Sequence, residues 1–454
     1  MNHDFFLKFL VAIKAGRRYL LCGLLLTACS SSYGVLDLND ALDLALSDDP
    51  GVDEILQDAE GLRSDAVAQS QLSDPVFLLG ALNFPVDTFD FDQEPMTQLL
   101  VGAKQMFPQG STLSLTEEKL LKKADSIHAR AQARYLRVTR EVRRIWLEIL
   151  YWIRARDILN QDIQLFDQLL DVTQSMYSVG KVQQKDVLRA ELELSRLQEK
   201  LIRANRTEQK NRATLARWIG VEARQAEWPL DIPDLRLGVL AQTVYSNGTM
   251  PPEFGNVASA LRNHPVLTSV RKQVDAADLD LQLSKEKYKP AWGVEVGYGF
   301  RDGQNPNGSN RSDFFSAKVT VSMPFFTRHR QDKSVESSIY RKQARIYAVD
   351  EQVLEMTGMV EQLLERLLQT DEQLALFDDE LLSRSKLQVE AARNAYQSDA
   401  AGFDEVMRAY LREQKDRLDY QRLLIERQQL ISDLQFYFPE AVPDLTERTG
   451  DRSQ

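Results

Sequence analysis

Cysteine is nearly absent from this chain of 454 residues. Its two cysteines, Cys22 and Cys29, both lie near the N-terminus, so we expect no disulfide framework in the folded protein. Glycine and proline are also sparse, at 21 and 15 residues, which argues against extended disorder. The mean hydropathy of −0.37 excludes a polytopic helical membrane protein, because each spanning helix needs about 20 consecutive apolar residues. These absences favour long amphipathic helices.

Positive charge and histidine are also in short supply. Lys and Arg number 56 against 67 Asp and Glu, and this net charge of −11 argues against a nucleic-acid partner. His128, His264 and His329 are widely separated, so the sequence predicts no metal site and no cofactor. No histidine accompanies a nucleophile motif and no phosphate-binding loop occurs, so we expect no enzymatic activity.

The first 28 residues have the pattern of a secretory signal peptide. Basic residues precede the apolar run 19–26, which is too short to span a membrane permanently, and small residues follow it. Leu26-Thr27-Ala28-Cys29 resembles the bacterial lipobox, in which the cysteine becomes the lipidated first residue of the mature protein. An ordinary signal peptide with a chance cysteine is the alternative. Ser30 stands where an inner-membrane retention signal would need Asp, so the sequence predicts an outer-membrane lipoprotein.

The mature sequence contains an internal duplication. Residues 41–55 align with 257–270 at an offset of 215, and residues 176–194 align with 395–413 at an offset of 219. A nearly constant offset over this length indicates that one large unit has been duplicated. Each copy is predicted to run helix, helix, strand, strand, long helix, helix.

The duplication divides the chain into five predicted segments. A signal peptide covers 1–28, and the two structural repeats cover 29–220 and 256–438. Residues 221–255 are rich in proline and glycine and are predicted to form a linker or irregular segment. Residues 439–454 are predicted to be a loose C-terminal tail.

Helix length narrows the fold class. The run 113–178 contains no proline, and as a helix of roughly 65 residues it would be about 100 Å long. Coiled coils hold such helices, whereas globular domains rarely do. Apolar residues between 187 and 204 recur at alternating spacings of three and four, which is a heptad seam. We therefore predict a mainly α protein built on long coiled-coil helices, with two shorter helices stacked end to end beside one long helix.

Four extended segments are predicted to be membrane strands, at about 76–84, 97–107, 291–301 and 315–323. Large apolar residues alternate with small or charged ones in the third segment, as they do in transmembrane β-strands. The first segment fits less well, because Phe77 and Leu79 are apolar at positions assigned to the polar face. A soluble sandwich with a half-buried sheet is the alternative.

Four strands cannot close a barrel, and an open sheet edge cannot stand in lipid. A membrane barrel needs at least eight strands, so closure requires two or more copies of the chain. Three copies would give a 12-stranded barrel with a water-filled bore. The alternation assigns four charged residues to this lumen: Lys104, Glu295, Arg301 and Lys318.

The lipobox, the duplicated units and the turn sequence Tyr177-Ser-Val-Gly180…Asp186-Val-Leu-Arg-Ala190 together resemble the TolC-type outer-membrane efflux family. The resemblance covers residues 35–438. It implies a homotrimer with a 12-stranded barrel in outer-membrane lipid and a helical tunnel extending into the periplasm. It also implies two partners, a periplasmic adaptor (membrane fusion) protein and an inner-membrane efflux pump, with which the trimer forms a passive exit duct.

Two stretches look like the heavy-metal-efflux branch of this family, namely 82–110 and 321–334. This branch would make metal ions the cargo rather than other small toxic compounds. A type I secretion channel is an alternative within the same family. A periplasmic coiled-coil adaptor or scaffold lipoprotein is another, but the alternating strands count against it.

The resemblance assigns the periplasmic tip and gate to the turns at Gly180 and Asp399. In the family, acidic residues at the second turn form a ring that narrows the tunnel and favours cations. Glu405, preceded by Asp404, matches the first position of the usual acidic pair, whereas Arg408 occupies the second. This departure puts the typical ring in doubt.

The tip residues have alternative interpretations. Arg408 and Glu405 could lock a closed tip by pairing between subunits. Alternatively, the acidic residues here, and Asp186 at the equivalent place in the first repeat, only favour a helix N-terminus through its dipole. Tyr177 and Tyr396 are either hydrogen-bond donors that latch the gate or aromatic residues that pack the hairpin turns.

Overall fold

The computed structural model describes residues 35–246, 254–398, 400–445 and 448. The predicted signal peptide, the predicted lipidation site Cys29 and the turn residue Asp399 lie outside these residues. Among the helices that are described, none combines the length and the apolar character needed to cross a membrane.

The first repeat contains two short helices, two strands and two long helices. They are α2 (Leu38–Ser47), α3 (Pro50–Gln69), β1 (Val76–Leu82), β2 (Gln98–Phe107), α4 (Thr112–Ser178) and α5 (Gln184–Ile219). The absence of proline over 113–178 is matched by an unbroken α4 of 67 residues. Gly220, with φ +68°, ends α5, and its N–H bonds to the carbonyl of Ala216.

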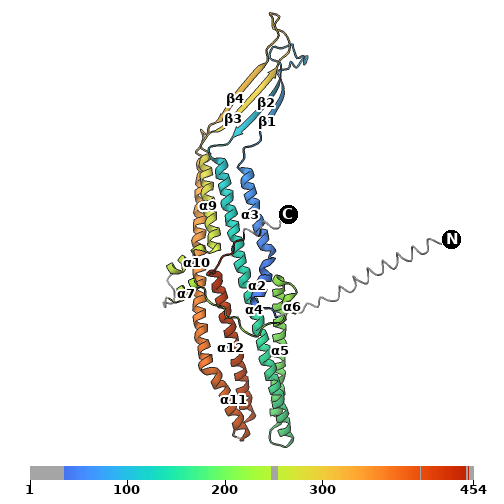
Figure 1. The fold of residues 1–454 in the computed structure, drawn as a ribbon, viewed down its shortest axis with the longest axis vertical. Coiled ribbons are helices and arrows are strands. Elements are labelled where there is room, and N and C mark those ends of the chain that lie inside the picture. Colours follow the sequence, from blue (N-terminus) through green and yellow to red (C-terminus); the bar gives the residue numbers. More distant parts are fainter. Residues whose placement is uncertain (1–34, 247–253, 399, 446–447, 449–454) are drawn as a thin grey trace, which may run out of the picture. The chain divides into compact units, whose positions relative to one another are not determined.

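The second repeat has the same order of elements (Figure 1). They are α8 (Phe254–Ala260), a 3₁₀ turn (Leu261–Asn263), α9 (Pro265–Glu286), β3 (Ala291–Phe300), β4 (Phe314–Ser322), α10 (Gln331–Leu376), a π-helical turn (Phe377–Leu381), α11 (Leu382–Gln397) and α12 (Phe403–Tyr437). The prediction of a mainly helical chain with a few strands is therefore confirmed.

The segment between the repeats is less irregular than its proline and glycine content indicates. It contains α6 (Glu222–Gln225), α7 (Val239–Ser246) and the beginning of α8. The described part of the C-terminal tail is packed as well. Leu445 is only 5% exposed against Val52, Leu56 and Ala131, and Gln132 donates a hydrogen bond of 3.0 Å to the carbonyl of Pro443.

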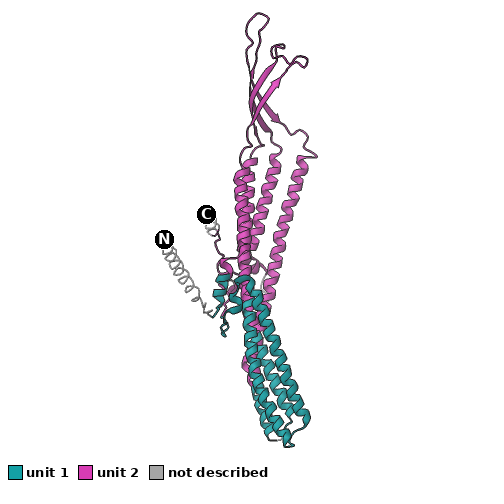
Figure 2. Ribbon diagram, turned by 90° about the vertical axis from the view of Figure 1, so that its right-hand side faces the viewer, with its two compact units in different colours: residues 1–44, 145–233, 385–422 teal, residues 45–144, 234–384, 423–454 magenta. Residues whose placement is uncertain are grey.

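The chain forms two compact units, and neither follows the repeat boundaries (Figure 2). Each unit takes helices from both repeats, because the duplicated helices pack against each other. One unit, which we call the hairpin unit, contains residues 1–44, 145–233 and 385–422. The other, the sheet unit, contains residues 45–144, 234–384 and 423–454.

The hairpin unit is held together by a seam of apolar side chains. The predicted heptad positions Ala190, Leu197 and Ala204 of α5 are buried there with Phe166 of α4 and Met407 of α12. Burial of this kind stabilises by about 25 cal/mol for each Å² of apolar surface removed from water. The seam therefore fixes the faces that α4, α5, α11 and α12 present to one another.

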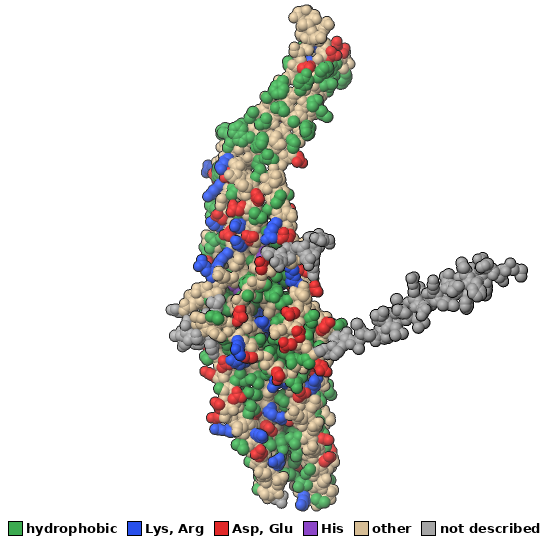
Figure 3. Space-filling model, in the orientation of Figure 1, with side chains coloured by type: hydrophobic (Ala, Val, Ile, Leu, Met, Phe, Trp, Pro, Cys, Tyr) green, Lys and Arg blue, Asp and Glu red, His purple; other side chains and the backbone are tan. Residues whose placement is uncertain are grey.

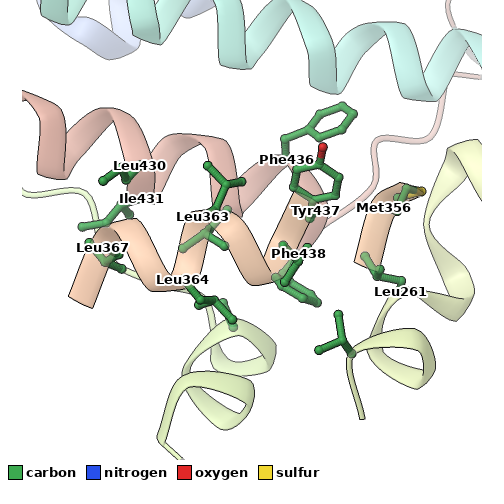
Figure 4. Packing of buried hydrophobic residues seen from close by; sticks show 14 of the residues in the cluster. Leu261, Met356, Leu363, Leu364, Leu367, Leu430, Ile431, Phe436, Tyr437 and Phe438 are labelled. Carbon is green, nitrogen blue, oxygen red and sulfur yellow. The ribbon is translucent and has the colours of Figure 1, made fainter. Parts of the chain in front are cut away.

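The sheet unit has its largest core where α12 ends (Figure 4). The cluster joins residues of α10, of the 3₁₀ turn, and of α12 with the residue that follows it: Leu261, Met356, Leu363, Leu364, Leu367, Leu430, Ile431, Phe436, Tyr437 and Phe438 are among them. The same unit carries the four-stranded antiparallel sheet, whose strand order is β1-β2-β3-β4.

Candidate functional site

The strand register divides the sheet into two different faces. On one face stand thirteen large apolar or aromatic residues, all exposed: Phe77, Leu79, Leu99, Val101, Phe107, Trp292, Val294, Val296, Tyr298, Phe300, Phe315, Val319 and Val321. Figure 3 shows this apolar surface over the strands. So large an exposed apolar patch marks a surface that is covered in the working protein.

The register corrects the expectation for β1. Phe77 pairs with Ala103 and Leu79 pairs with Val101, so both side chains lie on the apolar face with the other exposed hydrophobic residues. The predicted faces of β1 were wrong because β1 is apolar at nearly every position, so alternation within this one strand could not assign its faces. The pairing partner supplies the missing information.

The opposite face carries the only charged side chains of the four strands. Lys104 of β2 lies opposite Glu295 of β3, and Glu295 lies opposite Lys318 of β4, so the three stand in one row across the sheet. Opposite charges placed this way stabilise each other by roughly 0.2–1 kcal/mol. We call these three residues the charged row; it brings together three of the four predicted lumen residues.

Arg301, the fourth predicted lumen residue, lies just beyond the end of β3. Its guanidinium carbon is 4.1 Å from the centre of the Phe314 ring, and its backbone N–H donates to Asp313 at 2.8 Å. Arg301 is therefore fixed at the mouth of the loop 302–313, apart from the charged row.

Glycines of β3 leave room on the charged face for side chains of β2. A Cβ on Gly297 would lie 2.9 Å from a methyl carbon of Leu100, and one on Gly293 would lie 2.6 Å from the sulfur of Met106. The side chains of β2 thus lean over the glycines of β3. Leu100 and Met106 also show that this face is not uniformly polar.

The helical tips form the second candidate site. Gly180 has φ +74°, its N–H bonds to the carbonyl of Tyr177 at 2.9 Å, and the N–H of Lys181 bonds to Met176 at 2.9 Å. This pair of bonds is a Schellman motif, which requires a residue that tolerates left-handed backbone. Tyr177 itself points to solvent, so neither predicted role is visible for it here.

Tyr396 joins the two hairpins of the unit. Its ring lies 6.0 Å from that of buried Phe403, and its hydroxyl is 3.3 Å from the sulfur of Met176 at the end of α4. Tyr396 therefore packs against the turn and also donates a hydrogen bond to the other hairpin, and its role as a gate latch stays a prediction.

Asp404 is the centre of the charged contacts at the tip. It pairs with Arg189 of α5 and, at 2.8 Å, with Arg408 one turn further along α12. Within the described chain Arg408 pairs with Asp404, which lies one turn away on the same face of α12. Pairing of Arg408 with Glu405 between subunits stays a prediction.

Asp186 acts as a helix cap. Its carboxylate accepts a 3.1 Å hydrogen bond from the N–H of Gln183, and the N–H of Asp186 bonds back to the Gln183 carbonyl. This arrangement agrees with the helix-terminus reading of Asp186. A pocket of about 470 Å³ lies between the two tips, lined by Lys181, Lys185, Asp186, Arg189, Tyr396, Phe403 and Asp404 among others.

Sequence reasoning missed a set of buried polar contacts that connect the helices. Asp162 of α4, 3% exposed, accepts a 2.8 Å hydrogen bond from Gln414 and pairs with Arg417, both on α12. A buried carboxylate is costly unless it is paired. The signal was available, because Asp162 falls between core positions of α4, but its partners lie more than 250 residues away.

Among the described residues there is no group of three or more His, Cys, Asp or Glu side chains that could hold a metal ion. The two candidate sites of the described chain are the two-faced sheet and the two joined helical hairpins.

Known proteins share this architecture. The chain superposes on the outer-membrane channel OprN with a TM-score of 0.72 at 14% identity, covering 89% of this chain and 90% of that one. The TM-score with CusC, whose structures concern transmembrane channel formation, is 0.71 at 12% identity, covering 88% of this chain and 91% of that one. The TM-score with the outer membrane protein VceC of Vibrio cholerae is 0.69 at 14% identity, covering 88% of this chain and 94% of that one.

No protein of curated function matches the sequence. Residues 256–432, which span most of the second repeat, do match the family described as outer membrane efflux protein. The second repeat thus matches the outer membrane efflux protein family, and the chain as a whole shares the fold of these outer-membrane channels over about nine tenths of its length.

Proposed function

We propose that this protein is the outer-membrane exit duct of a tripartite efflux system. The observation that carries the proposal is the sheet, whose register gathers the exposed apolar side chains on one face and the charged row on the other. A membrane barrel needs this division, with lipid outside and water inside. The family match supports the same role.

In this proposal three copies complete the barrel, because β1 and β4 are the edges of the described sheet and each must find a strand to pair with. The trimer docks with a periplasmic adaptor and an inner-membrane pump, which supplies the energy. Lipidation of Cys29 anchors each chain in the outer membrane.

The helical tips act as the gate. Arg189–Asp404 and Tyr396–Met176 each join the α4–α5 hairpin to the α11–α12 hairpin within one chain. Separation of the hairpins requires these contacts to break. Each exposed ion pair contributes only about 0.2–1 kcal/mol, so a docked partner could release them without unfolding the helices.

Heavy-metal ions are the cargo that we propose, on the basis of residues 82–110 and 321–334. A conduit does not need to bind its cargo tightly. The alternatives are organic toxic compounds and, for a type I secretion channel, a protein.

The test is a susceptibility panel on a deletion strain and its complemented parent, with copper, silver, zinc, cobalt and cadmium beside detergents, dyes and antibiotics. Hypersensitivity to metals alone would support the heavy-metal assignment. Sensitivity to organic compounds alone would keep the duct and reject that cargo. If the purified protein inserted into planar bilayers formed no conducting pore, the duct itself would be wrong.

A further inference from the structure

The connection between β4 and α10, residues 323–330, presents apolar side chains to solvent without any cover. Phe326 is 93% exposed, more than any other large hydrophobic residue of the described chain, and Phe325 is 78% exposed. The turn is held by backbone bonds from the N–H groups of Arg330 and Asp332 to the Thr327 carbonyl. The backbone N–H of Phe325 also bonds to the Met323 carbonyl at 3.1 Å. Two phenylalanines exposed to this degree point to a surface that covers them.

These phenylalanines continue the apolar face of the sheet at its helical end. Trp292 is paired with Val321 near the end of β4, and Met323 follows, exposed like Trp292. The loop 302–313 leaves the opposite end of β3 and β4. Aromatic side chains of this kind gather where a membrane surface meets water, so residues 323–326 stand at the helix-side interface of the proposed barrel.

Positive charge follows immediately. Arg328, His329 and Arg330 are all exposed, and within the described residues neither arginine forms an ion pair. The neighbouring carboxylates are already engaged: Glu286 pairs with Lys289 at 2.7 Å, and Asp332 accepts from the Tyr288 hydroxyl at 2.7 Å. Figure 3 shows Lys and Arg side chains gathered on the helices just beyond the apolar strands.

We infer that residues 323–330 bind an anionic phospholipid at the helix-side surface of the bilayer. Phe325 and Phe326 enter the boundary between acyl chains and headgroups, and Arg328 and Arg330 contact the lipid phosphate. Arginine suits this role because its guanidinium can donate two parallel hydrogen bonds to phosphate oxygens. The inference rests on the proposed membrane barrel and adds the class of lipid that surrounds it.

The number of arginines determines how strongly residues 323–330 should prefer an anionic over a zwitterionic lipid. An arginine close to an anionic membrane surface favours binding about fivefold, and the effect weakens as salt rises. We therefore expect residues 323–330 to prefer phosphatidylglycerol over zwitterionic phosphatidylcholine by about fivefold or more at low ionic strength.

The test uses the full-length assembled protein in lipid vesicles. The sequence has no cysteine beyond residue 29, so Met323→Cys places one bimane fluorophore beside the phenylalanines. Its quenching is measured in vesicles of phosphatidylcholine and phosphatidylglycerol, with bromine on the acyl chains of either lipid in turn. Brominated phosphatidylglycerol should quench more strongly at equal mole fraction. The double variant Arg328→Gln/Arg330→Gln should abolish the difference.

A matched control replaces two exposed arginines of α5, Arg196→Gln/Arg203→Gln, and should keep the difference. Equal quenching by both lipids in the parent protein would overturn the inference while leaving the duct intact. Quenching by neither would mean that another copy of the chain or a protein partner covers these residues, which also overturns it. In that case, quenching of native Trp292 shows whether the sheet is in lipid at all, and its absence would count against the duct.

Discussion

Asp49 and His264 occupy equivalent positions in the two repeats, each followed by proline at the first position of a helix. The carboxylate of Asp49 accepts from the N–H of Gly51 at 3.1 Å, and Nδ1 of His264 accepts from the N–H of Val266 at 3.2 Å. Each side chain therefore caps its helix, and such a cap contributes about 1 kcal/mol.

The two caps differ in charge because their other partners differ. Arg134 donates two hydrogen bonds of 2.8 Å to Asp49. Burial alone raises the pKa of Asp49, but the bonds from Arg134 and Gly51 outweigh it and hold the pKa below its ordinary value. Nε2 of His264 instead lies 2.9 Å from the Phe436 carbonyl, so with Nδ1 accepting, the ring is neutral.

His264 should make stability depend on pH. Burial lowers its pKa below the ordinary 6.5, and the bond to Phe436 offsets this only in part. The unfolded chain therefore binds the proton first, and the stability from the neutral ring is present above pH 6.5 and is lost as the pH falls below it. We expect the melting temperature to drop between pH 7.5 and pH 5.5.

The variant His264→Asn keeps a capping side chain and removes the titration, so its melting temperature should change less over this interval. Asp49 titrates below the interval and provides no competing slope, since its pKa is lowered from 3.8. A variant whose melting temperature follows the same pH course as the parent would show that His264 is not the sensor.

Gly180 and Gly358 should respond in opposite ways to the same change. An added Cβ would meet no atom within 4 Å at either site, so space does not distinguish them. Gly180 has φ +74°, and alanine there would cost about 1–2 kcal/mol of backbone strain. Gly358 lies inside α10, where alanine should stabilise by about 0.5–1 kcal/mol. Thermal melting of both variants tests the turn assignment.

At the scale of elements, the two contacts of Asp404 have different meanings. Its pair with Arg408 lies within α12, whereas its pair with Arg189 connects α12 to α5. Only the second can resist separation of the hairpins. The charge and exposure of the two arginines are similar, so they form a natural comparison.

Arg189→Gln should therefore increase the open fraction of single channels in planar bilayers, by a factor of up to about five for the loss of one exposed ion pair. Arg408→Gln should leave the open fraction unchanged. If both variants opened the channel equally, net charge at the tip would be the controlling property rather than the contact between hairpins.

Element types were predictable because they depend on local pattern. The proline-free run predicted α4, the heptad spacing predicted the buried face of α5, and alternation predicted the faces of β3. What the sequence could not supply depends on partners distant in the chain. Pairing with β2 determines which side chains of β1 lie on the apolar face. Leu445 packs against residues of α3 and α4, and Asp162 accepts a hydrogen bond from a side chain of α12.

The candidate site was predictable to the same extent. Lys104, Glu295 and Lys318 were assigned to one face by parity alone, but only the register shows that they stand in one row. At the tip, the turn at Gly180 could be read from sequence, whereas the pairing of Asp404 with Arg189 depends on how two hairpins meet.

For the whole molecule, the charged row would provide two lysines for each glutamate in the proposed bore. We expect this excess of positive charge to favour anions at that level. Lys104→Gln/Lys318→Gln should shift the reversal potential under a KCl gradient toward cation selectivity, and Glu295→Gln should shift it the other way. The shifts should shrink from 0.1 M to 1 M salt, because the Debye length falls from about 10 Å to about 3 Å. If neither the lysine double variant nor Glu295→Gln shifted the reversal potential, the charged row would lie outside the conducting path.

The two-faced sheet also constrains how the newly synthesised chain can mature. In water, its edge strands would pair with any extended polypeptide, and its apolar face would promote aggregation. The hairpin helices carry a closed core of their own and meet no such hazard. We therefore expect the helices to fold first. The strands should stay unstructured, bound by a chaperone, until they pair with strands of other copies of the chain in a bilayer.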